Sequence, residues 1–142
     1  MMKKNISLHD AVAMVKDGSS IMVGGFLGTG SAKQLIDALA ETGVKDLTII
    51  CNDTVFTGQG WGKLLDNHQV KKVIATYIGG NSVSIDQMNS GEIEMELVPQ
   101  GTLAERIRAK GAGLGGVLTP TGLHTVIEKG KQIVNVDGKD YL

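Results

Sequence analysis

The sequence has little of several residue types, and each scarcity excludes a class of protein. Its 142 residues include one cysteine, so an internal disulfide and a cysteine-rich zinc site are both excluded. This cysteine content fits a reducing compartment, and we expect a cytoplasmic protein. Lysine and arginine number 14 against 15 aspartates and glutamates. The chain therefore lacks the basic excess typical of nucleic-acid-binding proteins.

Long apolar runs are also missing. No stretch approaches the roughly 18 apolar residues that a membrane-spanning helix needs. The basic start of the chain precedes no apolar segment of the kind found in secretory signals. We expect neither a membrane nor a nucleic acid as partner. Hydrophobic residues still make up 42% of the chain, which is enough for the core of one domain over residues 1–142.

Glycine is the residue in excess, while aromatic residues make up only 4% of the chain. The 20 glycines among 142 residues are roughly twice the average share of about 7%. Such a composition predicts many tight backbone passages and few bulky anchors. Function is therefore sought first in glycine loops.

Apolar periodicity predicts strands that alternate with helices. Short apolar or alternating runs typical of strands occupy residues 20–23, 46–51, 72–77 and 92–98. Helical spacing occurs at 8–15, after Ser31 and at 101–110, with Ser7 and Ser31 as expected N-caps. A hairpin is expected around Asp137-Gly138. This order indicates an α/β fold with an open, mostly parallel sheet and flanking helices.

The first strand is followed by a glycine loop, at the end of a parallel strand where ligands gather in such folds. The loop consists of Gly24, Gly25, Phe26, Leu27, Gly28, Thr29 and Gly30. Its glycines allow close approach of a ligand to the backbone. The N–H groups of the helix that follows suit an anion. We expect phosphate, a carboxylate or a developing oxyanion here, although the glycine pattern alone fits a ligand-free turn equally well.

Two common nucleotide-binding motifs do not fit this loop. A Walker A loop needs lysine followed by serine or threonine after its last glycine, whereas Ser31-Ala32 follows Gly30. A dinucleotide fingerprint needs a further glycine at the position of Lys33. The loop is therefore neither of these.

The longer string over residues 17–30 resembles the A-subunit signature of family I coenzyme A-transferases. That signature is Asp-Gly, a short apolar strand and Gly-Gly-Phe-x-x-x-Gly. Ala32 stands where the family usually has proline, which should loosen the start of the next helix. Blocks at 98–108, 111–113 and 118–122 occur in the same order in acetoacetate, acetate and 3-oxoacid coenzyme A-transferases. The resemblance covers nearly all of residues 7–142.

The resemblance implies an enzyme subunit that moves coenzyme A between a short-chain acyl-CoA or 3-oxoacyl-CoA and a free carboxylic acid. In the family a glutamate of the B subunit forms a glutamyl-CoA intermediate. No such glutamate motif occurs in this sequence, so it resembles the A (alpha) half of a hetero-oligomer. Coenzyme A is implied as a substrate, and no permanently bound cofactor or metal is expected.

The resemblance also bears on the extent of the chain. Family A subunits continue well past the hairpin at Asp137-Gly138. The resemblance therefore implies the N-terminal portion of a longer subunit. Missing strands would leave a sheet edge or an apolar surface, which self-association or a partner would cover.

Three further residues are candidates at strand ends. Gln100 follows a proline and precedes a helix, so its amide could donate toward a carbonyl oxygen that becomes negative in acyl transfer. The resemblance implies that it is the family's active-site glutamine. Asn52 and Asp53 follow the second strand. In the family, the residues at this position line the substrate pocket, and the resemblance implies the same for this pair. An Asx turn that ends the strand is the alternative for this pair.

Several residues look reactive but favour a structural interpretation. Glu92, Glu94 and Glu96 share one face of a strand, as in a solvated surface. Cys51 ends an apolar strand and is expected to be an inert thiol. The three histidines lack partners at metal-ligand spacing.

Two other functions remain open from the sequence. One is a non-catalytic module that binds acyl-CoA or an anionic metabolite. The other is a sugar-phosphate isomerase, for which Lys33 lies near the loop but no matching acid stands out.

Overall fold

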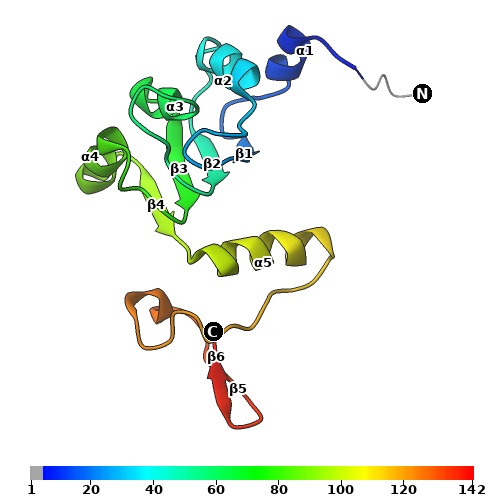
Figure 1. The fold of residues 1–142 in the computed structure, drawn as a ribbon, viewed down its shortest axis with the longest axis vertical. Coiled ribbons are helices and arrows are strands. Elements are labelled where there is room, and N and C mark those ends of the chain that lie inside the picture. The colour runs from blue at the N-terminus through cyan, green and yellow to red at the C-terminus, as the bar shows by residue number, and fades with distance from the viewer. Residues whose placement is uncertain (1–4) are drawn as a thin grey trace. The chain divides into compact units, whose positions relative to one another are not determined.

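The computed structural model describes residues 5–142, which divide between Leu97 and Val98 into two compact units. The first unit contains a four-stranded sheet and four helices, and the second contains one longer helix and a hairpin (Figure 1). In the part of the chain that the structure describes, no helix has the length and apolar character needed to cross a membrane. A single domain over 1–142 stays a prediction.

The sheet of the first unit is entirely parallel, with its strands in chain order. The strands are β1 (Ser20–Val23), β2 (Leu47–Cys51), β3 (Val70–Ala75) and β4 (Glu94–Leu97). Connections between neighbouring parallel strands are right-handed, so this order places the connecting helices on one face. Figure 1 shows these helices following one another beside the strands. The predicted open parallel sheet is confirmed.

The core lies between this sheet and its helices. Alternate residues of β2 are buried, with Leu47 and Ile49 fully inaccessible, because successive side chains of a strand point to opposite faces. Val73 of β3 pairs with Ile49 across the ladder and is equally buried. Leu64 and Leu65 join them in the same core cluster.

The first helix begins as predicted but ends early. Helix α1 spans Leu8–Ala13, and the Oγ of its N-cap Ser7 accepts a hydrogen bond from the Asp10 N–H at 3.0 Å. The predicted cap is confirmed, whereas the helix ends at Ala13, two residues before the end of the helical spacing at residue 15. The N–H groups of Met14 and Val15 donate to the carbonyl oxygens of Ala11 and Val12, three residues earlier, so the α-helical hydrogen-bond pattern ends there.

The second helix corrects another expectation. Helix α2 spans Lys33–Ala40, and its N-cap Ala32 provides no side-chain hydrogen bond. Ser31 does not cap the helix, because its hydroxyl donates to the Gly24 carbonyl oxygen at 2.9 Å. Ser31 therefore closes the base of the glycine loop.

Two short helices of the first unit have no clear counterpart in the sequence pattern. Helix α3 spans Gly62–Asp66 and helix α4 spans Ser82–Ser90. Helix α4 has a recognisable cap, because the side chain of Asn81 accepts a hydrogen bond from the Ser84 N–H at 3.1 Å. Its weak apolar periodicity explains why the pattern did not reveal it.

The second unit begins with helix α5 (Gln100–Gly111), close to the predicted bounds. A 3₁₀ turn, η1 (Val126–Glu128), and the predicted hairpin follow. The hairpin pairs β5 (Val134–Val136) with β6 (Lys139–Tyr141). Asp137 and Gly138 both have positive φ angles, of 51° and 77°, as a type I′ turn requires.

Candidate active-site loops

Two loops meet at the carboxyl ends of β1 and β2, around a cavity of about 330 Å³. The glycine loop contributes Leu27, Gly28 and Thr29 to its lining. The second loop contributes Val55, Gly58, Gln59 and Gly60. Strand ends of an open parallel sheet are where such folds bind ligands. The structure thus brings the predicted glycine loop to one pocket with the segment that follows Asn52 and Asp53.

The glycine loop is a tight turn locked by its own backbone. Phe26 and Thr29 exchange both backbone hydrogen bonds, at 3.0 and 2.9 Å. Gly25 has a φ of 125°, and a side chain there would lie 2.8 Å from the Thr29 carbonyl oxygen. Glycine is thus required at this position. The Phe26 side chain at the tip of the loop is 65% exposed.

Some amides of the loop are free to donate. The N–H groups of Phe26, Leu27 and Thr29 are engaged within the protein. Within residues 5–142, no acceptor takes the N–H of Gly28 or Gly30. Both residues have a φ of 84°. Gly28 also lines the cavity.

Asp53 lies beneath this loop and is only 3% exposed. Its Oδ2 accepts hydrogen bonds from the Leu27 N–H and the Asn52 side-chain amide, both at 2.9 Å. Its Oδ1 accepts from the Val55 N–H, also at 2.9 Å. Asn52 itself is half-buried. The placement of both residues in a substrate pocket stays a prediction, and Asp53 is enclosed by protein donors.

Val55 packs between the two loops in a strained conformation. Its φ is 58°, which is rare for a β-branched residue, and its side chain is 3% exposed. A side-chain carbon added to Gly28 would lie 3.2 Å from a Val55 methyl group, and one added to Gly60 would lie 3.5 Å from it. Glycines on both sides therefore leave room for this side chain.

Further polar contacts fix the second loop. Trp61 is 1% exposed and its Nε1–H donates to the Asp53 carbonyl oxygen at 3.1 Å. The Asp66 side chain accepts from the Gly58 N–H at 3.0 Å. Trp61 thus belongs to the core.

Two lysines line the same cavity and share one carboxylate. Lys33 and Lys63 both donate to Asp37, the latter at 2.6 Å. These hydrogen bonds, Lys33 first and then Lys63, lower the pKa of Asp37. Two ammonium groups on one carboxylate leave one positive charge beside the pocket, which favours anionic ligands. Lys63 was missed because a lysine after a glycine-rich loop has no distinctive sequence signal.

Gln100 lies in the other unit, at the first residue of α5, where it is exposed. Its role at the reacting carbonyl and its position relative to the glycine loop stay predictions.

The remaining reactive residues have structural surroundings. Cys51 is buried, and burial followed by the charge of Asp53 raises its thiol pKa strongly, which supports the inert state expected for it. Glu94 pairs with Lys72 at 2.6 Å and Glu92 pairs with His68, both at the surface. Among residues 5–142, no three metal-ligating side chains gather.

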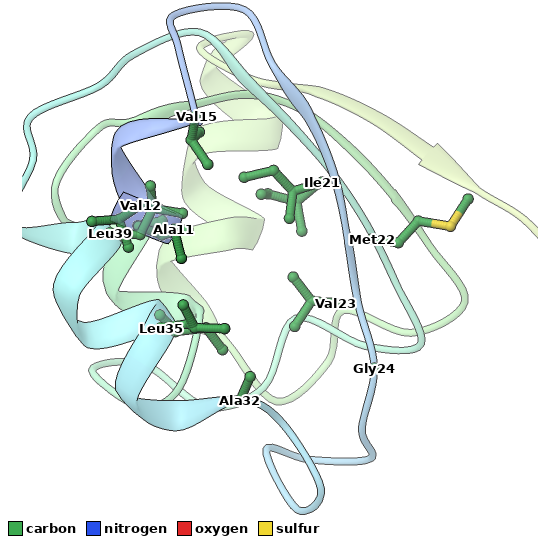
Figure 2. A pocket seen from close by; sticks show the side chains of 13 residues that line it. Ala11, Val12, Val15, Ile21, Met22, Val23, Gly24, Ala32, Leu35 and Leu39 are labelled. Carbon is green, nitrogen blue, oxygen red and sulfur yellow. The ribbon is translucent and has the colours of Figure 1, made fainter. Parts of the chain in front are cut away.

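A second, apolar cavity of about 270 Å³ lies between α1, β1 and α2 (Figure 2). Figure 2 shows Ile21, Val23 and Leu35 pointing into it. Gly24 and Ala32, at the two ends of the glycine loop, also line it. In the described chain, β1 pairs only with β2, so this cavity adjoins an open sheet edge.

Comparison with known proteins agrees with this arrangement. The family model described as coenzyme A transferase matches residues 5–142. The acetate CoA-transferase subunit alpha of Escherichia coli K12 is 54% identical over 142 residues, which are all of this chain and 64% of that subunit. The acetoacetyl-CoA:acetate/butyrate CoA transferase alpha subunit of Clostridium acetobutylicum is 52% identical, over all of this chain and 65% of its own length.

Among solved structures, an acyl-CoA transferase of Escherichia coli O157:H7, in a thioester complex with CoA, superposes with a TM-score of 0.82. It is 24% identical, and the match covers 96% of this chain and 31% of that one. This likeness shows a shared fold. The chain spans less than two thirds of the length of the two alpha subunits above.

Proposed function

Because this chain belongs to the coenzyme A transferase family, we propose that it is part of an alpha subunit that moves coenzyme A between short-chain acids. The donor is a short-chain acyl-CoA or 3-oxoacyl-CoA, and the acceptor is a free carboxylic acid of the acetate/acetoacetate class. The names of the two alpha subunits support this substrate class. The observation that carries the proposal is the glycine loop beside the pocket, with the unoccupied amides of Gly28 and Gly30 among residues 5–142.

The proposed chemistry is acyl transfer through a partner's carboxylate. A glutamate of a beta subunit attacks the thioester carbonyl, and the coenzyme A thiolate leaves as a mixed anhydride forms. The thiolate then attacks the glutamyl carbonyl, releases the first acid and forms a glutamyl-CoA thioester. The second acid reverses these steps. Each attack places negative charge on a carbonyl oxygen, which backbone N–H groups stabilise.

This chain contributes the donors and part of the pocket. The amides of Gly28 and Gly30 are the proposed oxyanion donors. Gln100 is proposed, from the family resemblance, as a supporting side-chain donor to a substrate carbonyl. Lys33 and Lys63 provide positive charge for anionic substrates. Asn52 lines the acid pocket. Coenzyme A is a substrate, with no resident cofactor.

We further place this activity in the cytoplasm, in a complex with a beta subunit. Self-association of the chain is part of the same proposal. The open edge of β1 and the adjoining apolar cavity support such contacts.

The decisive experiment combines the full-length alpha subunit with its beta subunit and follows coenzyme A exchange between acetoacetyl-CoA and acetate. Exchange by the pair, with neither subunit active alone, is the expected result. An inactive pair that still binds coenzyme A in calorimetry would instead establish the non-catalytic binding module. An inactive pair without binding would refute both readings.

A further inference from the structure

We propose that Asp53 is a positioning residue that holds the glycine loop in its donor geometry, and that its carboxylate does not bind the substrate. The catalytic consequence rests on the proposed function, whereas the structural part rests on the hydrogen bonds alone. This inference gives Asp53 a role different from the pocket lining expected from the sequence.

The Asp53 carboxylate is fully engaged by hydrogen-bond donors of the protein. Three N–H donors converge on it: the backbone of Leu27 and the side chain of Asn52 on Oδ2, and the backbone of Val55 on Oδ1. All three distances are 2.9 Å. With 3% of the residue exposed, little of it is open to a ligand. An ionised carboxylate is acceptor-only and suits a cage of donors.

The backbone is strained at two of the residues that donate to the Asp53 carboxylate. Leu27 and Val55 both have left-handed φ angles, of 47° and 58°, although neither is glycine. Such residues persist only where the surroundings hold them, and they concentrate at functional sites. Both of them donate their N–H to Asp53. One side chain thus holds one strained residue in each of the two loops.

The contact between Leu27 and Asp53 also affects the proposed donor at Gly28. The Leu27 N–H points to Asp53 and is unavailable to a substrate oxygen. Gly28 is the next residue, and its N–H belongs to the peptide whose orientation follows the Leu27 torsions. Fixing Leu27 therefore aims the Gly28 amide. A displacement of about 1 Å at such donors is enough to cost roughly a hundredfold in rate.

Asparagine is the most informative replacement because it keeps the shape and removes one acceptor. The amide offers a single oxygen, while the three donors lie on both oxygens of the native carboxylate. Whichever way the amide is turned, its NH₂ group faces an N–H donor. Asp53→Asn therefore releases either Leu27 with Asn52, or Val55. Asp17→Asn is the matched control, since Asp17 accepts the Lys45 N–H at 2.8 Å away from the loop.

The test uses the full-length alpha subunit assembled with its beta subunit. In Asp53→Asn we expect amide hydrogen exchange to rise about tenfold, as loss of one ordinary hydrogen bond predicts, either across residues 24–31 if Leu27 is released or at Val55 if Val55 is released. We expect kcat for coenzyme A exchange to fall roughly a hundredfold, with KM for the acyl-CoA much less changed. Asp17→Asn should leave both measurements at wild-type values.

Two results would contradict a positioning role for Asp53. A variant that raises KM and leaves kcat intact would make Asp53 a substrate ligand and overturn the inference. Unchanged amide hydrogen exchange both across residues 24–31 and at Val55 in a folded variant would also overturn it. If Asp53→Asn does not fold, residue-resolved exchange of the wild-type protein decides. Leu27 must then be protected while Gly28 and Gly30 exchange freely, and equal rates would refute the contact.

The inference and the proposed function can fail separately. A wild-type pair without coenzyme A exchange would refute the function, and the hydrogen-exchange results would still decide whether Asp53 holds the loop. An active wild-type pair in which Asp53→Asn behaves as wild type would refute only the inference.

Discussion

Gly24 and Gly25 are adjacent glycines for which the structure predicts opposite responses to alanine. At Gly24 an added side-chain carbon meets nothing within 4 Å. At Gly25 it would lie 2.5 Å from the Ser31 Oγ and 2.8 Å from the Thr29 carbonyl oxygen. The φ of 125° at Gly25 adds backbone strain to this clash. Gly24→Ala is thus an internal control for Gly25→Ala.

The size of the effect follows from what must move. Shifting Ser31 breaks its hydrogen bond to the Gly24 carbonyl oxygen, at about 0.5–1.5 kcal/mol. The forced backbone geometry adds about 1–3 kcal/mol. Gly25→Ala should therefore lower the free energy of unfolding by about 1.5–4.5 kcal/mol, as these two ranges combine. Gly24→Ala should stay within about 0.5 kcal/mol of wild type.

Urea unfolding of the full-length subunit measures both free energies, and coenzyme A exchange of the assembled enzyme reports the loop. The loop is distorted only in Gly25→Ala, so coenzyme A exchange should be lost in that variant and retained in Gly24→Ala. Equal stability and equal activity of the two variants would show that the tight turn at residues 24–30 is not the functional conformation.

Three further outcomes follow from single contacts. Trp61→Phe leaves the Asp53 carbonyl oxygen without its donor, so the free energy of unfolding should fall by about 1–3 kcal/mol; a thermal melt equal to wild type would contradict this. The pKa of Asp37 is lowered on folding, so its stabilisation is present above the ordinary value of 3.8 and is lost as pH falls through the lowered pKa. Asp37→Asn should remove that part of the loss of stability at acid pH, measured as the free energy of unfolding in urea at pH 3 to 6. An unchanged dependence of this free energy on pH would show that the Asp37 carboxylate does not cause it. Burial and the raised pKa of Cys51 predict that iodoacetamide labels it only after unfolding, whereas fast labelling of the native protein would show an open core.

The strands and the glycine loop were predictable because their signals are local. Alternating or continuous apolar runs gave β1 and β2 almost to the residue. The Asp137-Gly138 turn gave the hairpin, since both positions need a positive φ. Helix α4 was missed because its apolar positions are sparse, although its Asn81 cap is a local signal that could have been used.

Ser31 shows how a local rule fails when a tertiary contact competes. A serine before a helix normally caps it. Here the hydroxyl donates to the Gly24 carbonyl oxygen, seven residues earlier in the chain. The sequence contains both residues, but only the folded loop brings them together. The cavity residue Lys63 also depends on a tertiary contact, because it pairs with Asp37 across 26 residues, and the sequence alone does not show this pairing.

The contacts around Val55 have a consequence for how the two loops behave. Its side chain fills the space between Gly28 and Gly60, and its backbone donates to Asp53, which also accepts from Leu27. A change on either loop is therefore transmitted to the other through packed atoms and one carboxylate. Gly60→Ala should alter the glycine loop although residue 60 lies outside it, because the φ of 48° strains alanine and the added methyl group is in contact with Val55, so a shift of the strained backbone moves that side chain. Faster hydrogen exchange across residues 24–31 in Gly60→Ala would demonstrate this coupling, and exchange confined to residues 57–63 would show that the loops move independently.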